Sequence, residues 1–277
     1  MSVFAIPFPS IDPILFQIGP FAIRWYALAY VAGLLIGWRF ARALVSRDSL
    51  WGPVNRPTSD QMDDFLLWAT LGVVLGGRLG YVLFYNSDYY LQNPAEILVV
   101  WQGGMAFHGG FLGVALAMVL FARNKDFSLL SLSDVVSAVV TIGIFFGRIA
   151  NFINGELYGR VSDVPWAMVF PAGGPEPRHP SQLYEAVLEG MVLFAVLNWL
   201  IFRRGALRYP GRITGMFVLG YGLARMIAEF FRTPDAHIGF LTGGLTMGMA
   251  LSIPMVLAGL LILVLTRGRG SNGTERT

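Results

Sequence analysis

Seven stretches of this chain are apolar and long enough to be helices that cross a lipid bilayer, and they constrain the fold more than any other feature. A spanning helix needs about 20 mostly apolar residues. The stretches run over about 21–42, 65–85, 97–122, 132–152, 181–202, 213–231 and 240–266. The pattern predicts an all-α, polytopic membrane protein with seven transmembrane helices.

The composition supports this class of protein. Only 13% of the residues are charged and 55% are hydrophobic, whereas soluble domains carry about 25% charged residues. So few charges cannot cover a water-facing surface, which excludes an ordinary soluble enzyme and a disordered protein. The basic residues form no long run, so we expect no nucleic-acid partner. The chain has no cysteine and therefore no thiol nucleophile of its own.

The distribution of Arg and Lys predicts the orientation in the membrane. Basic residues follow the first, third, fifth and seventh spans, whereas the loop 86–96 has none. Because cytoplasmic loops are enriched in Lys and Arg, the N-terminus is expected outside and the C-terminus in the cytoplasm. We expect residues 1–266 to form one transmembrane domain, with 153–180 as a small extracytoplasmic cap and 267–277 as a cytoplasmic tail.

Several glycines recur at a spacing of four residues within the predicted spans. Gly72, Gly76 and Gly80 form one such series, and Gly109 and Gly113 form another. Small residues at this spacing let helix backbones approach closely in a membrane. The pattern predicts tight helix packing and carries no information about function.

Polar residues that recur at similar depth in different spans are the candidates for a site. At about 1.5 Å per residue, they fall in the middle-to-outer part of the bilayer. A charged side chain at membrane depth is costly, so it is a functional candidate by default. The set comprises Tyr26, Arg78, His108, Arg148, Glu189 and Arg225.

Each candidate also has a structural interpretation. Arg225 and Glu229 are spaced i, i+4, so they could form only an intrahelical ion pair. Arg78 shares a helix face with Tyr81 and could be a structural anchor. His108 could be a satisfied core histidine, although flanking glycines would let a ligand approach it.

Arginines near the outer leaflet suit an anion carried by a lipid. A guanidinium binds phosphate oxygens bidentately and stays charged at physiological pH. The sequence contains no metal-ligand cluster, phosphate loop or serine nucleophile elbow, so we expect no metal and no cofactor. His108 and either Glu156 or Glu189 are available for proton transfer. These residues indicate a lipid-phosphate enzyme or, as an alternative, a phospholipid or solute transporter with an outer-leaflet anion site.

The segment 147–159, which reads GRIANFINGELYG, resembles the signature of the prolipoprotein diacylglyceryl transferase family. Other similar stretches are RWY at 24–26, GGRLGY at 76–81, FHGG at 107–110, RHPSQLYE at 178–185 and YGLAR at 221–225. The resemblance extends over about 21–248. That family has seven spans, an outside N-terminus and an inside C-terminus.

The resemblance implies an enzyme that acts on membrane lipid. It would transfer the diacylglyceryl group of phosphatidylglycerol to the lipobox cysteine in the signal peptide of a prolipoprotein. A thioether forms and glycerol 1-phosphate leaves, which is the first step of bacterial lipoprotein maturation. The expected location is the bacterial cytoplasmic (inner) membrane, with the active site facing the outer leaflet.

The resemblance also suggests roles for individual residues. Arg148 and Arg225 are expected to stabilise charge on the phosphate. His108 is the candidate base for the thiol, unless Arg225 activates it by electrostatics alone. The remaining substrate-binding candidates are Asn151, Asn154 and Glu156 for headgroup hydroxyls, Tyr26 and Tyr221 for the lipid cavity, and Arg78 and Glu229.

Overall fold

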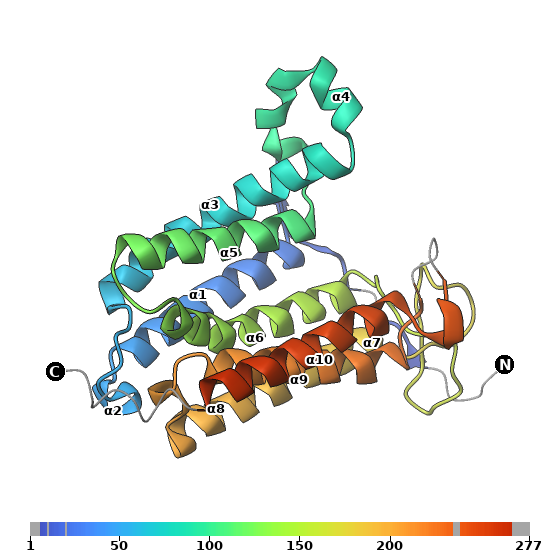
Figure 1. Cartoon of the computed structure of the whole chain (residues 1–277). Coiled ribbons are helices and arrows are strands. Elements are labelled where there is room, and N and C mark those ends of the chain that lie inside the picture. Colours follow the sequence, from blue (N-terminus) through green and yellow to red (C-terminus); the bar gives the residue numbers. More distant parts are fainter. Residues whose placement is uncertain (1–5, 10, 20, 235–238, 268–277) are drawn as a thin grey trace.

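The computed structural model of the protein describes residues 6–9, 11–19, 21–234 and 239–267, and in this part of the chain helices predominate (Figure 1). The long helical units are α1 (Trp25–Val45), α3 (Ser59–Phe84), α5 (Phe107–Asn124), α6 (Leu129–Ile153), α9 (Arg212–Glu229), α10 (Met247–Thr266) and a compound helix of α7 (Ser181–Glu185), the π-helical segment η3 (Ala186–Val192) and α8 (Leu193–Arg204). The shorter helices are α2 (Asp48–Trp51), α4 (Ser87–Gln92), η1 (Pro94–Leu98), η2 (Val100–Gln102), η4 (Ala206–Arg208) and η5 (Thr242–Gly244).

Within the described residues, six of these units are long and apolar enough to cross a membrane, which identifies a polytopic membrane protein. They are α1, α3, α5, α6, the compound helix and α10. The helix α9 lies where the sixth span is expected, but its 18 residues include Arg212, Arg225 and Glu229. A seventh crossing therefore stays a prediction. Of the expected cytoplasmic tail, 268–277 lie outside the described residues.

Three of the expected spans begin too early. Residues 21–24 of the first form strand β3 (Phe21–Arg24), and glycine explains the other two errors. The third was expected from 97, but α5 begins at Phe107 after two short 3₁₀ turns. Gly103 and Gly104 have φ angles of 91° and 76°, which end any helix there. The seventh was expected from 240, but Gly243 has a φ of 80° and α10 begins at Met247.

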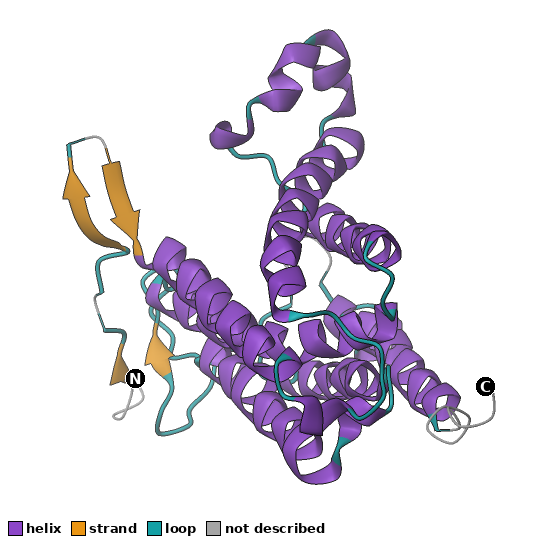
Figure 2. Ribbon diagram, turned by 90° about the vertical axis from the view of Figure 1, so that its left-hand side faces the viewer, coloured by secondary structure: helices purple, strands orange, loops and turns teal. Residues whose placement is uncertain are grey.

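An all-α description is also incomplete, because two small sheets lie at one end of the molecule. Strand β1 (Ile6–Pro7) pairs in parallel with β4 (Met168–Val169), which belongs to the segment expected as a cap. Strand β2 (Ile14–Ile18) pairs with β3 (Phe21–Arg24) in an antiparallel hairpin. Figure 2 shows this hairpin projecting beyond the start of α1. Prolines keep the chain before α1 from being helical, and strand pairing satisfies its backbone instead.

Close glycine contacts hold α3 against α5. A Cβ atom added to Gly76 would lie 2.4 Å from the carbonyl oxygen of Gly109, and one added to Gly113 would lie 2.0 Å from that of Gly72. Both distances are shorter than any real Cβ contact, so only glycine allows this backbone approach. The expected role of the glycine series in helix packing is confirmed.

The apolar core lies mainly toward the end of the bundle that contains α2 (Figure 1). Leu132, Leu197, Ile201 and Ile213 are fully buried and belong to α6, α8 and α9. The indole of Trp51 in α2 is also fully buried and donates to the carbonyl of Leu44 at 2.9 Å. This packing fixes the helices at one end, and Arg148 of α6 and Arg225 of α9 lie toward the other.

Asp134 on α6 fixes the start of α9. Its carboxylate accepts hydrogen bonds from the backbone N–H groups of Gly211 (2.8 Å) and Thr214 (2.7 Å) and from the Thr214 hydroxyl (2.7 Å). These backbone donors have no intrahelical partner at a helix N-terminus. Asp134, which is fully buried, therefore acts as a helix cap supplied from another helix.

We expect Asp134→Ala to destabilise the folded protein by about 2 kcal/mol or more, because buried donors of α9 would lose their acceptor. The measurement is the unfolding temperature in detergent. The matched control is Asp163→Ala, at an exposed aspartate of the segment 153–180. Equal unfolding temperatures for the two variants would contradict the capping role.

Candidate functional site

A network of alternating arginine and glutamate side chains links α6, the compound helix and α9. Arg148 on α6 pairs through Nη1 with Oε2 of Glu185 at 2.8 Å and through Nη2 with Oε2 of Glu189 at 3.1 Å. Glu185 and Glu189 are four residues apart, so they lie on one face of their helix. Glu185 ends α7 and Glu189 lies within η3.

Arg225 on α9 shares the same two carboxylates. Its Nη1 atom lies 3.2 Å from Oε2 of Glu185 and 3.7 Å from Oε1 of Glu189. Its Nη2 atom pairs with Oε1 of Glu229, one helical turn later, at 2.5 Å. Arg148 and Arg225 therefore meet at one carboxylate, as expected for side chains that act together.

Arg232 closes the network just beyond the end of α9. Its Nη1 atom lies 3.3 Å from Oε1 of Glu185, and its Nε atom lies 3.7 Å from Oε1 of Glu229. Thr246, at the start of α10, donates its hydroxyl to Oε2 of Glu229 at 2.6 Å. The ion network thus consists of three arginines and three glutamates: Arg148, Arg225, Arg232, Glu185, Glu189 and Glu229.

The ion network is buried and balanced in formal charge. The side chains of Arg148 and Arg225 are 18% and 17% exposed, whereas those of Glu185 and Glu189 are 1% and 0% exposed. Removing charges from water is costly, and a buried pair offsets this cost only with good geometry and further hydrogen bonds. The glutamates therefore hold the guanidinium groups in place from the interior, while the arginines remain partly accessible.

The segment 153–180 packs against the end of α9, beside the ion network. Arg160 donates from Nε to the carbonyl of Arg232 at 2.8 Å and from Nη2 to that of Glu229 at 3.1 Å. A Cβ atom at Gly159 would lie 2.4 Å from the carbonyl oxygen of Phe231, so glycine is needed at this contact. These contacts fix the backbone that carries two members of the network.

A group of three aromatic side chains lies beside the contact between the segment 153–180 and the end of α9. The ring of His179 lies 5.8 Å from that of Tyr184 and 5.2 Å from that of Phe231, both in edge-on geometry. Nδ1 of His179 is 3.1 Å from the Tyr184 hydroxyl. Partial burial lowers the pKa of His179, which favours the neutral imidazole. The group is a structural boundary between the segment 153–180 and the end of α9.

The predicted headgroup residues lie near the C-terminal end of α6. Asn151 donates from Nδ2 to Oε1 of Glu156 at 2.7 Å, and Gln182 on α7 donates to the Glu156 carbonyl at 2.6 Å. Asn154 is the C-terminal cap residue of α6 and is half-buried. Asn151, Asn154 and Glu156 thus follow Arg148 within about two helical turns.

The predicted tyrosines form aromatic pairs of their own. The hydroxyls of Tyr26 and Tyr30 are 3.3 Å apart, and both residues lie on α1. The ring of Tyr221 lies 5.9 Å from that of Phe217 on α9. Because Tyr221 is half-buried and lies one turn before Arg225, it borders the ion network along α9.

Arg78 occupies a different position from the ion network. Its guanidinium donates to four backbone carbonyls, those of Glu96, Ile97, Gly103 and Gly104, over 2.6–3.2 Å. It holds the irregular segment between α4 and α5. These contacts agree with a role for Arg78 as a structural anchor. They engage all three nitrogen atoms of its guanidinium group.

His108 lies at the second position of α5 and is exposed. Its ring contacts that of Phe107 edge-on, with 5.6 Å between centroids. Over the described residues, no hydrogen bond or ion pair joins His108 to the ion network. The structure therefore brings Arg148, Arg225 and Glu229 together directly, and it does not bring His108 or Arg78 into contact with them.

Sequence reasoning gave no role to Glu185, Arg232 and Thr246, although Glu185 was within a motif. A signal existed, because Glu185 and Glu189 are four residues apart in a predicted span, and Arg232 follows Glu229 by three. Such spacing predicts one helix face. It does not predict that the face meets α6 and α9, which depends on the packing of the three helices.

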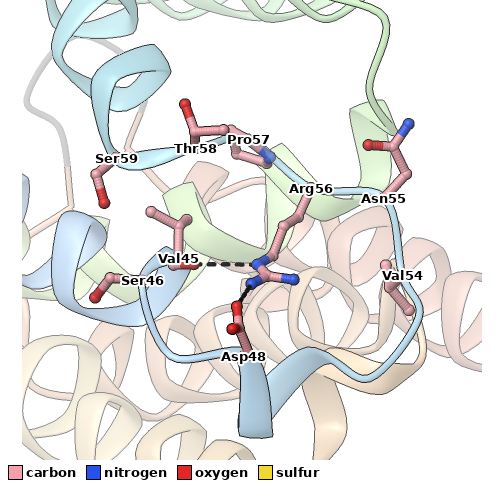
Figure 3. Close-up of a pocket in the computed structure, with 9 residues that line it drawn as sticks. All are labelled: Val45, Ser46, Asp48, Val54, Asn55, Arg56, Pro57, Thr58 and Ser59. Carbon is pink, nitrogen blue, oxygen red and sulfur yellow. Dashed lines mark hydrogen bonds and ion pairs between the residues drawn. The ribbon is translucent and has the colours of Figure 1, made fainter.

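A cavity of about 450 Å³ lies at the other end of the bundle, between α1 and α3 (Figure 3). Arg56 points into it, pairs with Asp48 and donates to the Val45 carbonyl at 3.1 Å. Asp48 thus compensates the charge of Arg56. None of the predicted site residues lines this cavity. Among the described residues, no group of three or more His, Asp or Glu side chains could hold a metal ion.

Comparisons with known proteins agree with the sequence resemblance. The family model for prolipoprotein diacylglyceryl transferase matches residues 13–265. A phosphatidylglycerol–prolipoprotein diacylglyceryl transferase of Rhodopseudomonas palustris is 58% identical over 98% of this chain and 96% of its own. Enzymes of the same name from Rhizobium meliloti (60% identical, 92% of each chain) and Paramagnetospirillum magneticum (61% identical, 97% of this chain and 98% of the relative) are also similar.

We expect Glu185→Ala to destabilise the folded protein by about 3–5 kcal/mol, because three arginines would lose a shared, buried counter-charge. Unfolding in detergent, followed by temperature or denaturant, measures the effect. Glu176→Ala, at an exposed glutamate of the segment 153–180, is the control. A loss no larger than that of the control would mean that Glu185 does not hold the ion network together.

Proposed function

The chain belongs to the prolipoprotein diacylglyceryl transferase family, and we propose that its buried ion network holds the anionic headgroup of the donor lipid. The protein is a transferase of lipoprotein biosynthesis, which moves the diacylglyceryl group of phosphatidylglycerol to prolipoproteins. The transporter alternative is not favoured, since the relatives are named as transferases. The observation that carries the proposal is that Arg148 and Arg225 meet at Glu185.

The N–H groups of the Arg148 and Arg225 guanidinium groups support a role in binding the headgroup phosphate. Each terminal nitrogen of an arginine carries two N–H groups. Nη1 of Arg148 contacts Glu185, and Nη2 contacts Glu189. Nη1 of Arg225 donates to Glu185 and lies 3.7 Å from Glu189, beyond hydrogen-bond distance, and Nη2 contacts Glu229. One N–H group on each terminal nitrogen can therefore bind a phosphate oxygen without displacing a carboxylate.

The proposed reaction is a substitution at a glycerol carbon of phosphatidylglycerol. The sulfur of the acceptor cysteine forms a bond to this carbon, the bond from the carbon to the phosphate oxygen breaks, and glycerol 1-phosphate leaves with the electron pair. The thiol proton goes to a base. Negative charge grows on the phosphate, where Arg148 and Arg225 would stabilise it from fixed positions.

His108 is the proposed base, with the positive field of Arg225 as the alternative means of forming the thiolate. A free thiol has a pKa near 8.5, so either route would raise its thiolate fraction. His108 is exposed at the start of α5, outside the ion network. In this proposal it meets the acceptor cysteine, while the arginines meet the donor phosphate.

The remaining predicted residues would position the substrates. We propose that Asn151, Asn154 and Glu156 bind headgroup hydroxyls and that Glu229 orients Arg225. Tyr26 and Tyr221 would contact the lipid. For Arg78, the proposed contribution is indirect, because its four carbonyl contacts shape the segment that leads to His108.

The membrane arrangement is also proposed. α9 would be the remaining span, the sixth in chain order, with its charged residues facing other helices instead of lipid. The basic residues after α1, α5 and α8 support a cytoplasmic location for the end that contains α2. The ion network and segment 153–180 would then face the outer leaflet of a bacterial inner membrane, where the lipobox of a prolipoprotein signal peptide can reach them.

Mass spectrometry of a lipobox peptide incubated with purified protein and phosphatidylglycerol tests the function. Arg148→Lys and Arg225→Lys should each lower the rate of thioether formation by about 100-fold or more, because a point charge cannot replace a planar donor group. Arg204→Lys, at an exposed position at the end of α8, should keep the normal rate. A folded Arg148→Lys variant with most of its turnover would contradict the headgroup role.

His108→Asn tests the proton step. If His108 is the base, the substitution should reduce turnover by about 100–10,000-fold and remove an ionisation from the pH–rate profile. The exposed Asp163→Asn variant serves as a control for the profile. An unchanged pH dependence in His108→Asn would leave thiol activation to Arg225.

A further inference from the structure

An apolar groove lies between α6 and the π-helical part of the compound helix. Its volume is about 160 Å³, and it is lined by Thr141, Ile142, Phe145, Gly190, Met191 and Phe194. The one hydroxyl in this set, that of Thr141, donates to the Ala138 carbonyl at 2.9 Å. Apolar side chains offer water no hydrogen-bond partners. The lining therefore suits an alkyl chain.

The groove lies beside the ion network, on the next turns of the same two helices. Phe145 precedes Arg148 by three residues and Thr141 precedes it by seven, so the three side chains lie along one stripe of α6. On the opposite wall, Gly190 directly follows Glu189. The Arg148–Glu189 ion pair therefore joins the same two helices whose next turns form the groove.

The direction of the groove matches a phospholipid whose phosphate lies at the ion network. Arg148 lies near the C-terminal end of α6, and the groove extends back along the helix toward Thr141. Seven residues of helix correspond to about 10 Å. An acyl chain that leaves the headgroup toward the bilayer centre would run along this path.

We propose that this groove binds one acyl chain of the donor phospholipid and that its side chains help to determine which chain lengths are accepted. The inference rests on the proposed function of the ion network. It assigns a tail-binding site to residues that take no part in the phosphate chemistry. The phosphate fixes one end of the donor and the groove fixes the start of its hydrocarbon part.

The backbone around Gly190 explains why a groove forms here. A π-helical turn carries an extra residue and often lies at a functional site. A Cβ atom at Gly190 would lie 2.7 Å from Cβ of Phe145, so a larger residue would push the two helices apart. Phe194 packs against Phe40 of α1 with 5.5 Å between ring centroids. Helix α1 therefore supports the wall of the groove that Phe194 forms.

The test compares donors with long and short acyl chains. Ile142→Trp narrows the groove, and Phe194→Ala widens it. With dipalmitoyl and dioctanoyl phosphatidylglycerol as donors, we expect Ile142→Trp to lower the ratio of their kcat/KM values by about 10-fold, the scale of discrimination by apolar pockets. Phe194→Ala should leave the ratio unchanged or raise it. Leu261→Trp, at a 58% exposed leucine of α10, is the matched control and should match the wild type.

A photolabel gives a second readout that does not depend on turnover or on a folded variant. Phosphatidylglycerol with a diazirine in one acyl chain should label peptides that contain 141–145 or 190–194 in the wild-type protein. Excess unlabelled phosphatidylglycerol should reduce this labelling, whereas excess phosphatidylcholine should not. Equal competition by both lipids would mean that bulk membrane lipid fills the groove, and would overturn the proposal.

Other outcomes are equally decisive. An unchanged ratio of the kcat/KM values for the two donors in a folded Ile142→Trp variant would contradict the tail-binding site. Labelling confined to other helices would contradict it as well. Failure of the proposed headgroup site is distinguishable, because a folded Arg148→Lys variant would then keep its turnover with both donors. Competed labelling of the groove together with an unimpaired Arg148→Lys variant would keep the tail site and reject the headgroup role.

Discussion

The site depends on the ion pairs that the carboxylate of Glu185 makes with three arginines. This carboxylate lies within 3.3 Å of guanidinium nitrogens from Arg148, Arg225 and Arg232, and so joins three helical units at one point. Charges of the same sign would otherwise repel one another in a region of low dielectric. By compensating them from the buried side, Glu185 and Glu189 allow two arginines to lie together while both remain partly accessible.

The two ends of the bundle serve different purposes. Toward α2, buried apolar residues such as Leu132 and Ile213 hold the helices together, and Asp134 fixes where α9 begins. This rigid end sets the register of α6 and α9. At the other end the same helices carry Arg148 and Arg225, and Thr246 of α10 holds Glu229 beside them. In the proposed reaction, side chains held in this way would be preorganised for the charge that develops on the phosphate.

The compound helix contributes residues to both the ion network and the apolar groove. Its π-helical segment bears Glu189 toward the ion network and Gly190 toward the apolar groove. An amphiphilic donor needs both surfaces in sequence along the membrane normal. The proposed recognition of the donor is therefore divided between an ionic site and an apolar one, both built from α6 and the compound helix.

The sequence alone determined the membrane class and the approximate helices and singled out Arg148 and Arg225 as charged residues within predicted spans, because apolar length and charge are properties of local sequence. It also identified the family. It did not determine that helix α5 begins at Phe107, since this depends on glycine φ angles and on carbonyl contacts to Arg78. Nor could it predict that Glu185 joins three arginines. That arrangement arises only when α6, α7 and α9 pack together, because ion pairing across helices depends on their relative rotation and depth.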